Sequence, residues 1–133
     1  MRLNEKVSVL KLDLRTDERG RFCTLLDKTQ IGDSGFGTLI ITTAHPNRVK
    51  GNHYHKNTRD WMCVVSGEGL LRLEDVQTRE SLELKMGESN FVLVEIPPNV
   101  SHGIKNIGSS EMIVVEYSDR SFEEKKKDAH PFV

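Results

Sequence analysis

Three histidines and one carboxylate are the residues of this chain whose types and spacing could do chemistry. His53 and His55 are separated by one residue, Asp60 follows soon after, and His102 lies towards the far end of the 133-residue chain. On an extended segment, side chains two residues apart point to the same side of the strand. A fold that brings the four together would build either a ligand set for a divalent metal or a group of acids and bases for proton transfer.

Short β-strands are the elements expected to position these side chains. Many short apolar stretches separated by turn residues such as Arg19-Gly20 and Pro97-Pro98-Asn99 predict an all-β sandwich or barrel. The expected strands cover residues 7–14, 22–26, 38–43, 61–65, 70–73, 81–84, 91–96 and 112–117.

One helix is expected, at residues 121–128 near the C-terminus. Ser121 can cap its first turn, and acidic residues precede three lysines, an order that suits the helix dipole. A solvated charged tail is the alternative interpretation of the same residues.

Length and composition indicate one ordinary soluble domain that spans residues 1–133. A formal net charge of −1 gives no electrostatic reason to expect binding to nucleic acid or to an anionic membrane. Cys23 and Cys63 form no C-x-x-C pair, which favours reduced thiols. No stretch resembles a signal peptide or is apolar over the roughly 20 residues of a membrane span, so we expect a cytoplasmic protein.

Two motifs with matching internal spacing surround the histidines. The first runs H-Y-H at 53–55, then four residues, Asp60, six residues and Gly67; the second runs P-P-N-V-S-H at 97–102, then three residues and Asn106. They resemble the paired motifs of the cupin superfamily, with Asp60 in place of the usual Glu and Asn99 in place of the usual Gly. Asn is the next-best residue at positive φ. The resemblance implies a cupin double-stranded β-helix, which is a jelly-roll barrel.

The flanking residues narrow the resemblance. Residues 17–22 (D-E-R-G-R-F) and 49–54 (V-K-G-N-H-Y) are similar to motifs of dTDP-4-dehydrorhamnose 3,5-epimerases. Residues 49–55 and 64–69 resemble motifs in the C-terminal cupin domain of capsular polysaccharide reductase–epimerases. Residues 51–55 (G-N-H-Y-H) also resemble the G-x-H-x-H motif of dTDP-sugar 3,4-ketoisomerases. The resemblance implies an isomerase that epimerises or ketoisomerises a nucleotide-linked 4-keto-6-deoxy sugar in surface-polysaccharide or deoxysugar biosynthesis.

The same resemblance suggests roles for individual residues in proton abstraction next to the keto group. His53 is the first choice for the general base and His55 the second, while Tyr117 is a candidate acid. Arg48 and Lys50 are candidates to bind the substrate diphosphate, with two solvated cations as the alternative.

Trp61 follows Asp60 and could stack on the sugar or the base, with packing in a strand as the alternative.

A divalent metal, zinc above others, is expected at His53, His55, Asp60 and His102, because the capsular reductase–epimerase cupins carry zinc at this motif. Metal-free catalysis through the histidine, as in the rhamnose epimerases, is the alternative. Related cupins also imply a homodimer, which would protect exposed sheet edges.

Two other functions remain open from the sequence. One is a different metal-dependent cupin enzyme, such as a dioxygenase or a sugar-phosphate isomerase, because three histidines and a carboxylate suit those reactions equally well. The other is a non-enzymatic cupin that binds a sugar.

Overall fold

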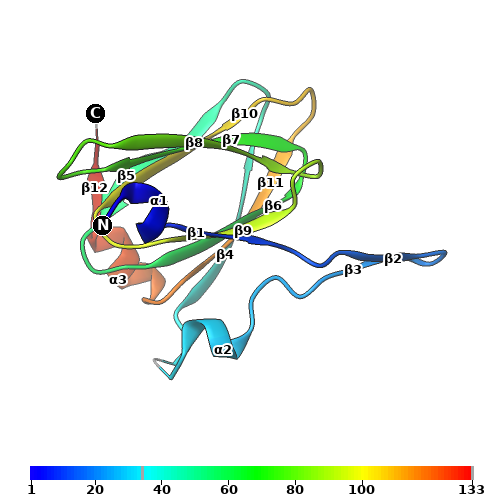
Figure 1. Ribbon diagram of the computed structural model, residues 1–133, viewed down its shortest axis with the longest axis horizontal. Coiled ribbons are helices and arrows are strands. Elements are labelled where there is room, and N and C mark those ends of the chain that lie inside the picture. Colours follow the sequence, from blue (N-terminus) through cyan, green and yellow to red (C-terminus); the bar gives the residue numbers. More distant parts are fainter. Residues whose placement is uncertain (34, 133) are drawn as a thin grey trace.

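The protein folds into two five-stranded antiparallel sheets that pack face to face (Figure 1). The computed structural model describes residues 1–33 and 35–132. The first sheet has the order β1 (Ser8–Lys11), β9 (Val92–Ile96), β6 (Asp60–Ser66), β11 (Met112–Ser118) and β4 (Thr38–Ala44). The second sheet has the order β12 (Ala129–Pro131), β5 (Val49–His55), β10 (Val100–Asn106), β7 (Glu68–Asp75) and β8 (Ser81–Gly87). The predicted all-β class is confirmed.

The apolar core lies between the two sheets because alternate residues of each strand point inward. Burial of β7 follows this period: Leu71 and Leu73 are fully buried, whereas Arg72 between them is exposed. The short helix α1 (Leu3–Lys6) adds Leu3, also fully buried, to the same core. Complete burial of such a side chain contributes about 1.5–3 kcal/mol, so this interior supplies most of the force that closes the barrel.

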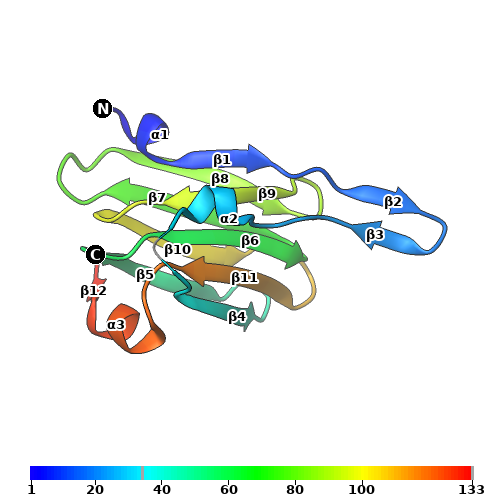
Figure 2. The same ribbon diagram turned by 90° about the horizontal axis from the view of Figure 1, so that it is seen from below.

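A two-stranded hairpin and a short helix lie outside the barrel. The hairpin, β2 (Arg15–Asp17) and β3 (Gly20–Phe22), projects away from the two sheets (Figure 2). The chain then crosses the outer side of the first sheet, where it forms α2 (Lys28–Ile31). The strand predicted at 22–26 is therefore wrong beyond Phe22: Leu25 and Leu26 are partly buried against that outer face and have no strand partner to pair with.

The predicted C-terminal helix is confirmed as α3 (Phe122–Lys127). The Ser121 hydroxyl accepts a hydrogen bond from the backbone N–H of Glu124, and the Glu124 side chain bonds back to the N–H of Ser121. This reciprocal pair satisfies two backbone donors at the start of the helix. None of the helices in the described residues is long and apolar enough to cross a membrane.

Candidate functional site

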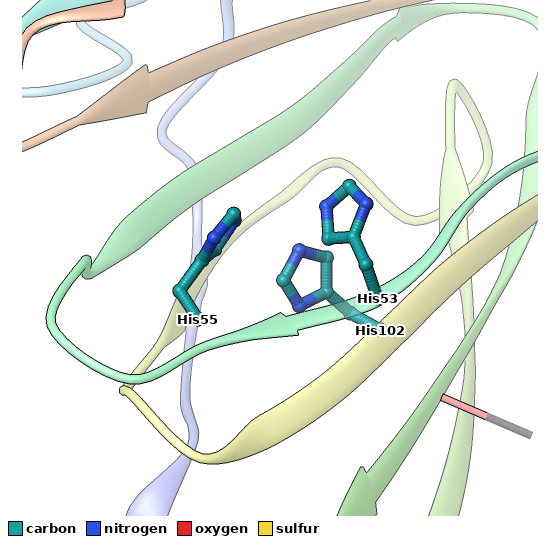
Figure 3. Close-up of side chains that lie close together, drawn as sticks. All are labelled: His53, His55 and His102. Atoms are coloured by element: carbon teal, nitrogen blue, oxygen red, sulfur yellow. The ribbon is translucent and has the colours of Figure 1, made fainter. Parts of the chain in front are cut away.

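The three histidines come from neighbouring strands of the second sheet. His53 and His55 lie on β5, and His102 on β10 is the cross-strand partner of His53. Their rings project to the same side and converge (Figure 3). The ring centroids are 4.9 Å apart for His53 with either neighbour and 5.6 Å apart for His55 with His102.

A local irregularity next to His102 lets the two strands approach closely. The pairing of β5 with β10 shifts between His102 and Gly103, and opposite this shift Gly51 has a φ of +100°. A Cβ at Gly51 would lie 2.9 Å from the His102 carbonyl oxygen, so a side chain there would push β10 away. Asn99, in the turn before β10, has a φ of 64°, which agrees with the expectation that this position takes positive φ.

Asp60 reaches the histidines from the other sheet, at the start of β6. Its Oδ2 atom lies 3.3 Å from His55 Nε2 and 3.4 Å from His102 Nε2. All three residues are at least 97% buried, with 2%, 1% and 3% of the surface of His55, Asp60 and His102 exposed. An aspartate is therefore long enough to meet these imidazoles, although it is one methylene shorter than the glutamate usual in cupins.

The hydrogen bonds that His55 and His102 make on the side away from Asp60 show which ring nitrogen carries the hydrogen. His55 Nδ1 lies 3.0 Å from the Asp128 carbonyl oxygen and His102 Nδ1 lies 3.2 Å from that of Val100. A carbonyl only accepts, so each Nδ1 carries the hydrogen, and in the neutral form of the ring Nε2 presents a lone pair.

Three acceptor atoms therefore point at one another. His55 Nε2, His102 Nε2 and Asp60 Oδ2 are buried and have no hydrogen-bond partner in the described chain. Uncompensated acceptors of this kind are costly in a low-dielectric interior. A proton on one imidazole or a cation between the atoms would relieve the repulsion, and imidazole nitrogen with carboxylate oxygen is a donor set that suits a divalent metal. The residues present thus fit a metal.

Charged neighbours change the protonation of this cluster. Burial opposes a charge on His55, yet Asp60 outweighs it and raises the pKa of the imidazole. Burial likewise opposes ionisation of Asp60, but His102, His55 and Lys125 together hold its pKa well below the usual range. Burial, with the other two imidazoles, lowers the pKa of His53 to about 4, so His53 is neutral at pH 7.

Two further charged residues belong to the site, and sequence reasoning missed both. Lys125 of α3 is 7% exposed and donates from Nζ to Glu116 of β11 and, at 2.8 Å, to Ser118 Oγ. The same ammonium lies 3.4 Å from Asp60 Oδ1, which also accepts a hydrogen bond from Ser118. With neutral imidazoles, two carboxylates against one ammonium leave one net negative charge, which favours a cation.

The histidines open into a small cavity between the sheets. Its volume is about 190 Å³, and His53, His102, Lys50 and Glu116 are the titratable side chains among its described lining residues. The apolar part of the cavity wall is formed by Ile40, Met62, Ile104 and Val114. Binding pockets for whole drug-sized molecules typically measure 300–1,000 Å³, so this cavity suits a single ring or a similar small group.

The predicted site residues divide into two groups in the structure. His53, His55, Asp60 and His102 come together, and Lys50 lines the cavity. Arg48 is exposed in the turn before β5 and lines none of this cavity.

The structure does not bring Tyr117 and Trp61 to the histidines. Their ring centroids are 5.6 Å apart on the outer face of the first sheet, because both residues alternate with the inward-facing Asp60, Glu116 and Ser118. The Tyr117 hydroxyl accepts a hydrogen bond from the Gly37 N–H at 2.8 Å. These two residues therefore pack on the outer face, which for Trp61 is the alternative expected from the sequence.

Comparison with known proteins identifies the family. Residues 15–130 match the family described as the polysaccharide biosynthesis C-terminal domain. The chain belongs to this family. It is 26% identical over 117 residues to a UDP-2-acetamido-2,6-beta-L-arabino-hexul-4-ose reductase of Pseudomonas aeruginosa, a match that covers 88% of this chain and 30% of the reductase. The chain thus spans less than a third of that enzyme.

A relative of similar size and a solved structure extend the comparison. The spore coat polysaccharide biosynthesis protein SpsL of Bacillus subtilis is 28% identical over 127 residues, which cover 92% of this chain and 84% of SpsL. The crystal structure of a dTDP sugar isomerase from Desulfovibrio desulfuricans superposes with a TM-score of 0.86 at 21% identity, covering 97% of this chain and 85% of the isomerase. This similarity confirms the predicted cupin-like barrel.

Proposed function

We propose that this family member is an isomerase that moves a proton on the carbon next to the keto group of a nucleotide-linked 4-keto sugar. The single observation that carries the proposal is the convergence of three imidazoles and Asp60 beside a cavity about the size of one sugar ring. The name of the Pseudomonas relative, a reductase of a UDP-linked hexul-4-ose, supports this class of substrate. Epimerisation and ketoisomerisation both begin with this proton abstraction.

The size of the cavity indicates how such a substrate would lie. About 190 Å³ accommodates the sugar ring, while the nucleotide remains outside. Lys50 is exposed and also lines the cavity, which supports a contact between its ammonium and the diphosphate at the entrance. We propose this role for Lys50, and we keep Arg48 as a weaker candidate because it lies outside the cavity lining.

We also propose that His53, His55, Asp60 and His102 hold a divalent metal, with zinc the first choice. The support is the set of three unpartnered acceptor atoms and the net negative charge around them. When bound, such a metal would act as a Lewis acid that stabilises negative charge on the keto oxygen. Without a metal, the lowered pKa of His53 leaves a neutral imidazole next to the cavity, which is the form that a general base requires.

Solvent exchange tests the proposed reaction. The protein is incubated in D₂O with a UDP- or dTDP-linked 4-keto-6-deoxyhexose, and deuterium at C3 or C5 is measured by mass spectrometry and NMR. We expect incorporation by the native protein and a loss of about 10²–10⁴-fold or more in His53→Ala. His45→Ala removes an exposed loop histidine and is the matched control, expected to retain full exchange.

The outcomes separate the competing functions. Tight binding of the sugar nucleotide without deuterium incorporation would indicate a binding module and would contradict the proposal. Exchange that survives complete chelation of metal would show that the histidines act as free bases. Exchange that is lost on chelation and restored by zinc would show that the metal is catalytic.

The homodimer implied by related cupins stays a prediction. Three large apolar side chains, those of Phe36, Leu39 and Ile41, are 76%, 62% and 69% exposed on or beside β4. Burial of these side chains against a second copy would remove them from water. Sedimentation equilibrium of the native chain and of an Ile41→Glu variant tests this expectation.

A further inference from the structure

His55 and Asp60 meet in the interior although they lie on different sheets. His55 ends β5 of the second sheet, and Asp60 begins β6 of the first sheet. Residues 56–59 join them, so the conformation of this turn helps to set the 3.3 Å distance between His55 Nε2 and Asp60 Oδ2. The turn lies between the two strands and outside both ladders, so its backbone N–H groups need partners from elsewhere in the fold.

The carboxylate of Asp128, in the C-terminal segment, supplies those partners. Its Oδ1 accepts a hydrogen bond from the Lys56 N–H at 3.0 Å, and its Oδ2 accepts one from the Asn57 N–H at 2.8 Å. The same Oδ2 accepts a third hydrogen bond, at 2.8 Å, from the hydroxyl of Thr58, a residue that is 1% exposed. One side chain therefore holds three consecutive residues of the turn.

The main chain of Asp128 contacts the site directly. Its carbonyl oxygen lies 3.0 Å from His55 Nδ1, and the next residue, Ala129, pairs with His55 between β12 and β5. Asp128 is also the C-cap of α3, and Lys125, three residues earlier, lies 3.4 Å from Asp60 Oδ1. The last turn of one short helix thus contacts both His55 and Asp60, which come from different sheets.

We propose that Asp128 is a positioning residue for the proposed metal site, which fixes the ring of His55 and, through the turn, its distance from Asp60. This inference rests on the proposed function and deepens it, because it names the residue that presents His55 Nε2 rather than Nδ1 to the ion. The partner of the second ring nitrogen orients a ligating imidazole, and loss of such a partner typically lowers metal affinity about 10–100-fold. The carboxylate of Asp128 adds to this effect because it holds the turn between the two ligands.

The test uses Asp128→Asn, which keeps the shape of the side chain but leaves fewer acceptors for the three donors of the turn. We expect the Kd for zinc, measured by competition with a chromophoric chelator, to rise about 10–100-fold. In the zinc-free protein at alkaline pH, ¹⁵N NMR of the imidazole should show His55 as the Nδ1–H tautomer in the native chain and as a mixture of tautomers in the variant.

Glu68→Gln is the matched control. The Glu68 carboxylate likewise accepts hydrogen bonds from a backbone N–H and a hydroxyl, both of Ser89. It stands at the start of β7, whereas Leu73, five residues later, is the residue of β7 that pairs with His102. The control should therefore keep the native Kd for zinc and the native His55 tautomer, even where it lowers stability.

Each outcome supports or contradicts the inference. A native Kd and a native His55 tautomer in Asp128→Asn would overturn it and leave the proposed metal site standing. An equal rise in Kd for Asp128→Asn and Glu68→Gln would also overturn it, because the effect would then be a general loss of structure. Native protein that binds no zinc would contradict the proposed metal site, and this inference with it. If Asp128→Asn does not fold, Thr58→Val decides, because it removes one of the three hydrogen bonds: a smaller rise in Kd supports the role, and a native Kd excludes it.

Discussion

The two faces of strands β6 and β11 differ sharply, although alternate residues of the same two strands build both. The inward face presents Asp60, Glu116 and Ser118, which form a charged network with Lys125. The outward face presents Trp61, Cys63 and Tyr117, which line an apolar groove of about 400 Å³ together with the segment that contains α2.

The two faces differ in how well their buried polar atoms are hydrogen-bonded. On the inward side, three buried acceptors converge without a donor. On the outward side, the Tyr117 hydroxyl has its partner, and among the described residues the Trp61 N–H is the buried side-chain atom without one. A lone N–H costs little compared with facing lone pairs beside a carboxylate. Converging unsatisfied acceptors therefore indicate a binding site, whereas the outward face indicates packing.

Removal of the Lys125 ammonium from the inward face should cause the largest loss of stability. Lys125→Met leaves Asp60 and Glu116 without their ammonium partner, and we expect a loss of about 3–5 kcal/mol in the free energy of unfolding, measured by urea denaturation. Lys126→Met, at an exposed position of the same helix, should lose almost nothing. Added zinc should restore part of the loss in the Lys125 variant. Equal stability of the two variants would show that the network is not stabilising.

A buried carboxylate with a complete set of protein partners provides the reference for Asp60. Burial opposes ionisation of Asp75, but Lys6 and the backbone N–H groups of Gln77 and Thr78 outweigh it, so its pKa lies below 3.8. The ionised form is thus favoured in the folded state, and its stabilisation is present above pH 3.8 and is lost as the pH falls through the lower folded value.

Asp75→Asn should therefore lower the free energy of unfolding by about 1–3 kcal/mol at pH 7, and the deficit should shrink below about pH 3.8. Urea denaturation of the native protein and the variant at a series of pH values measures this deficit. Zinc should not rescue this variant, in contrast with Lys125→Met. A deficit that stays constant down to pH 2 would mean that the charge of Asp75 is not the source of its contribution.

The smallest loss of stability is expected from a substitution on the outward face. Tyr117→Phe leaves the Gly37 N–H without its acceptor and should cost about 0.5–1.5 kcal/mol of stability, with the rate of deuterium exchange unchanged. Thermal unfolding and the D₂O assay measure the two quantities on one preparation. A large loss of exchange would mean that the outward face takes part in the reaction, and it would remove the functional distinction between the two faces.

Sequence reasoning was successful where local spacing carries the information. The period of two along a strand predicted that His53 and His55 share a face, and Ser121 with Glu124 marked the start of α3. The strand prediction was wrong at 23–26, because an apolar segment that packs on a sheet surface has the same composition as a strand. Tyr117 was proposed from its resemblance to the tyrosine of the epimerases, and Trp61 from its position next to Asp60. Neither argument considered which face of its strand the residue takes.

By itself, the sequence determined the all-β class, the cupin-like motifs and the four residues of the histidine–aspartate cluster, because each depends on spacing within one strand or on motif order. Only the tertiary structure decided that Lys125 and Glu116 join the cluster. The lysine lies in a helix whose residues are almost all charged, so no apolar stripe marks its buried side. Its partner is on a strand nine residues earlier, and the contact exists only because α3 folds back against β11. Pairing across the fold, rather than local pattern, completes the site.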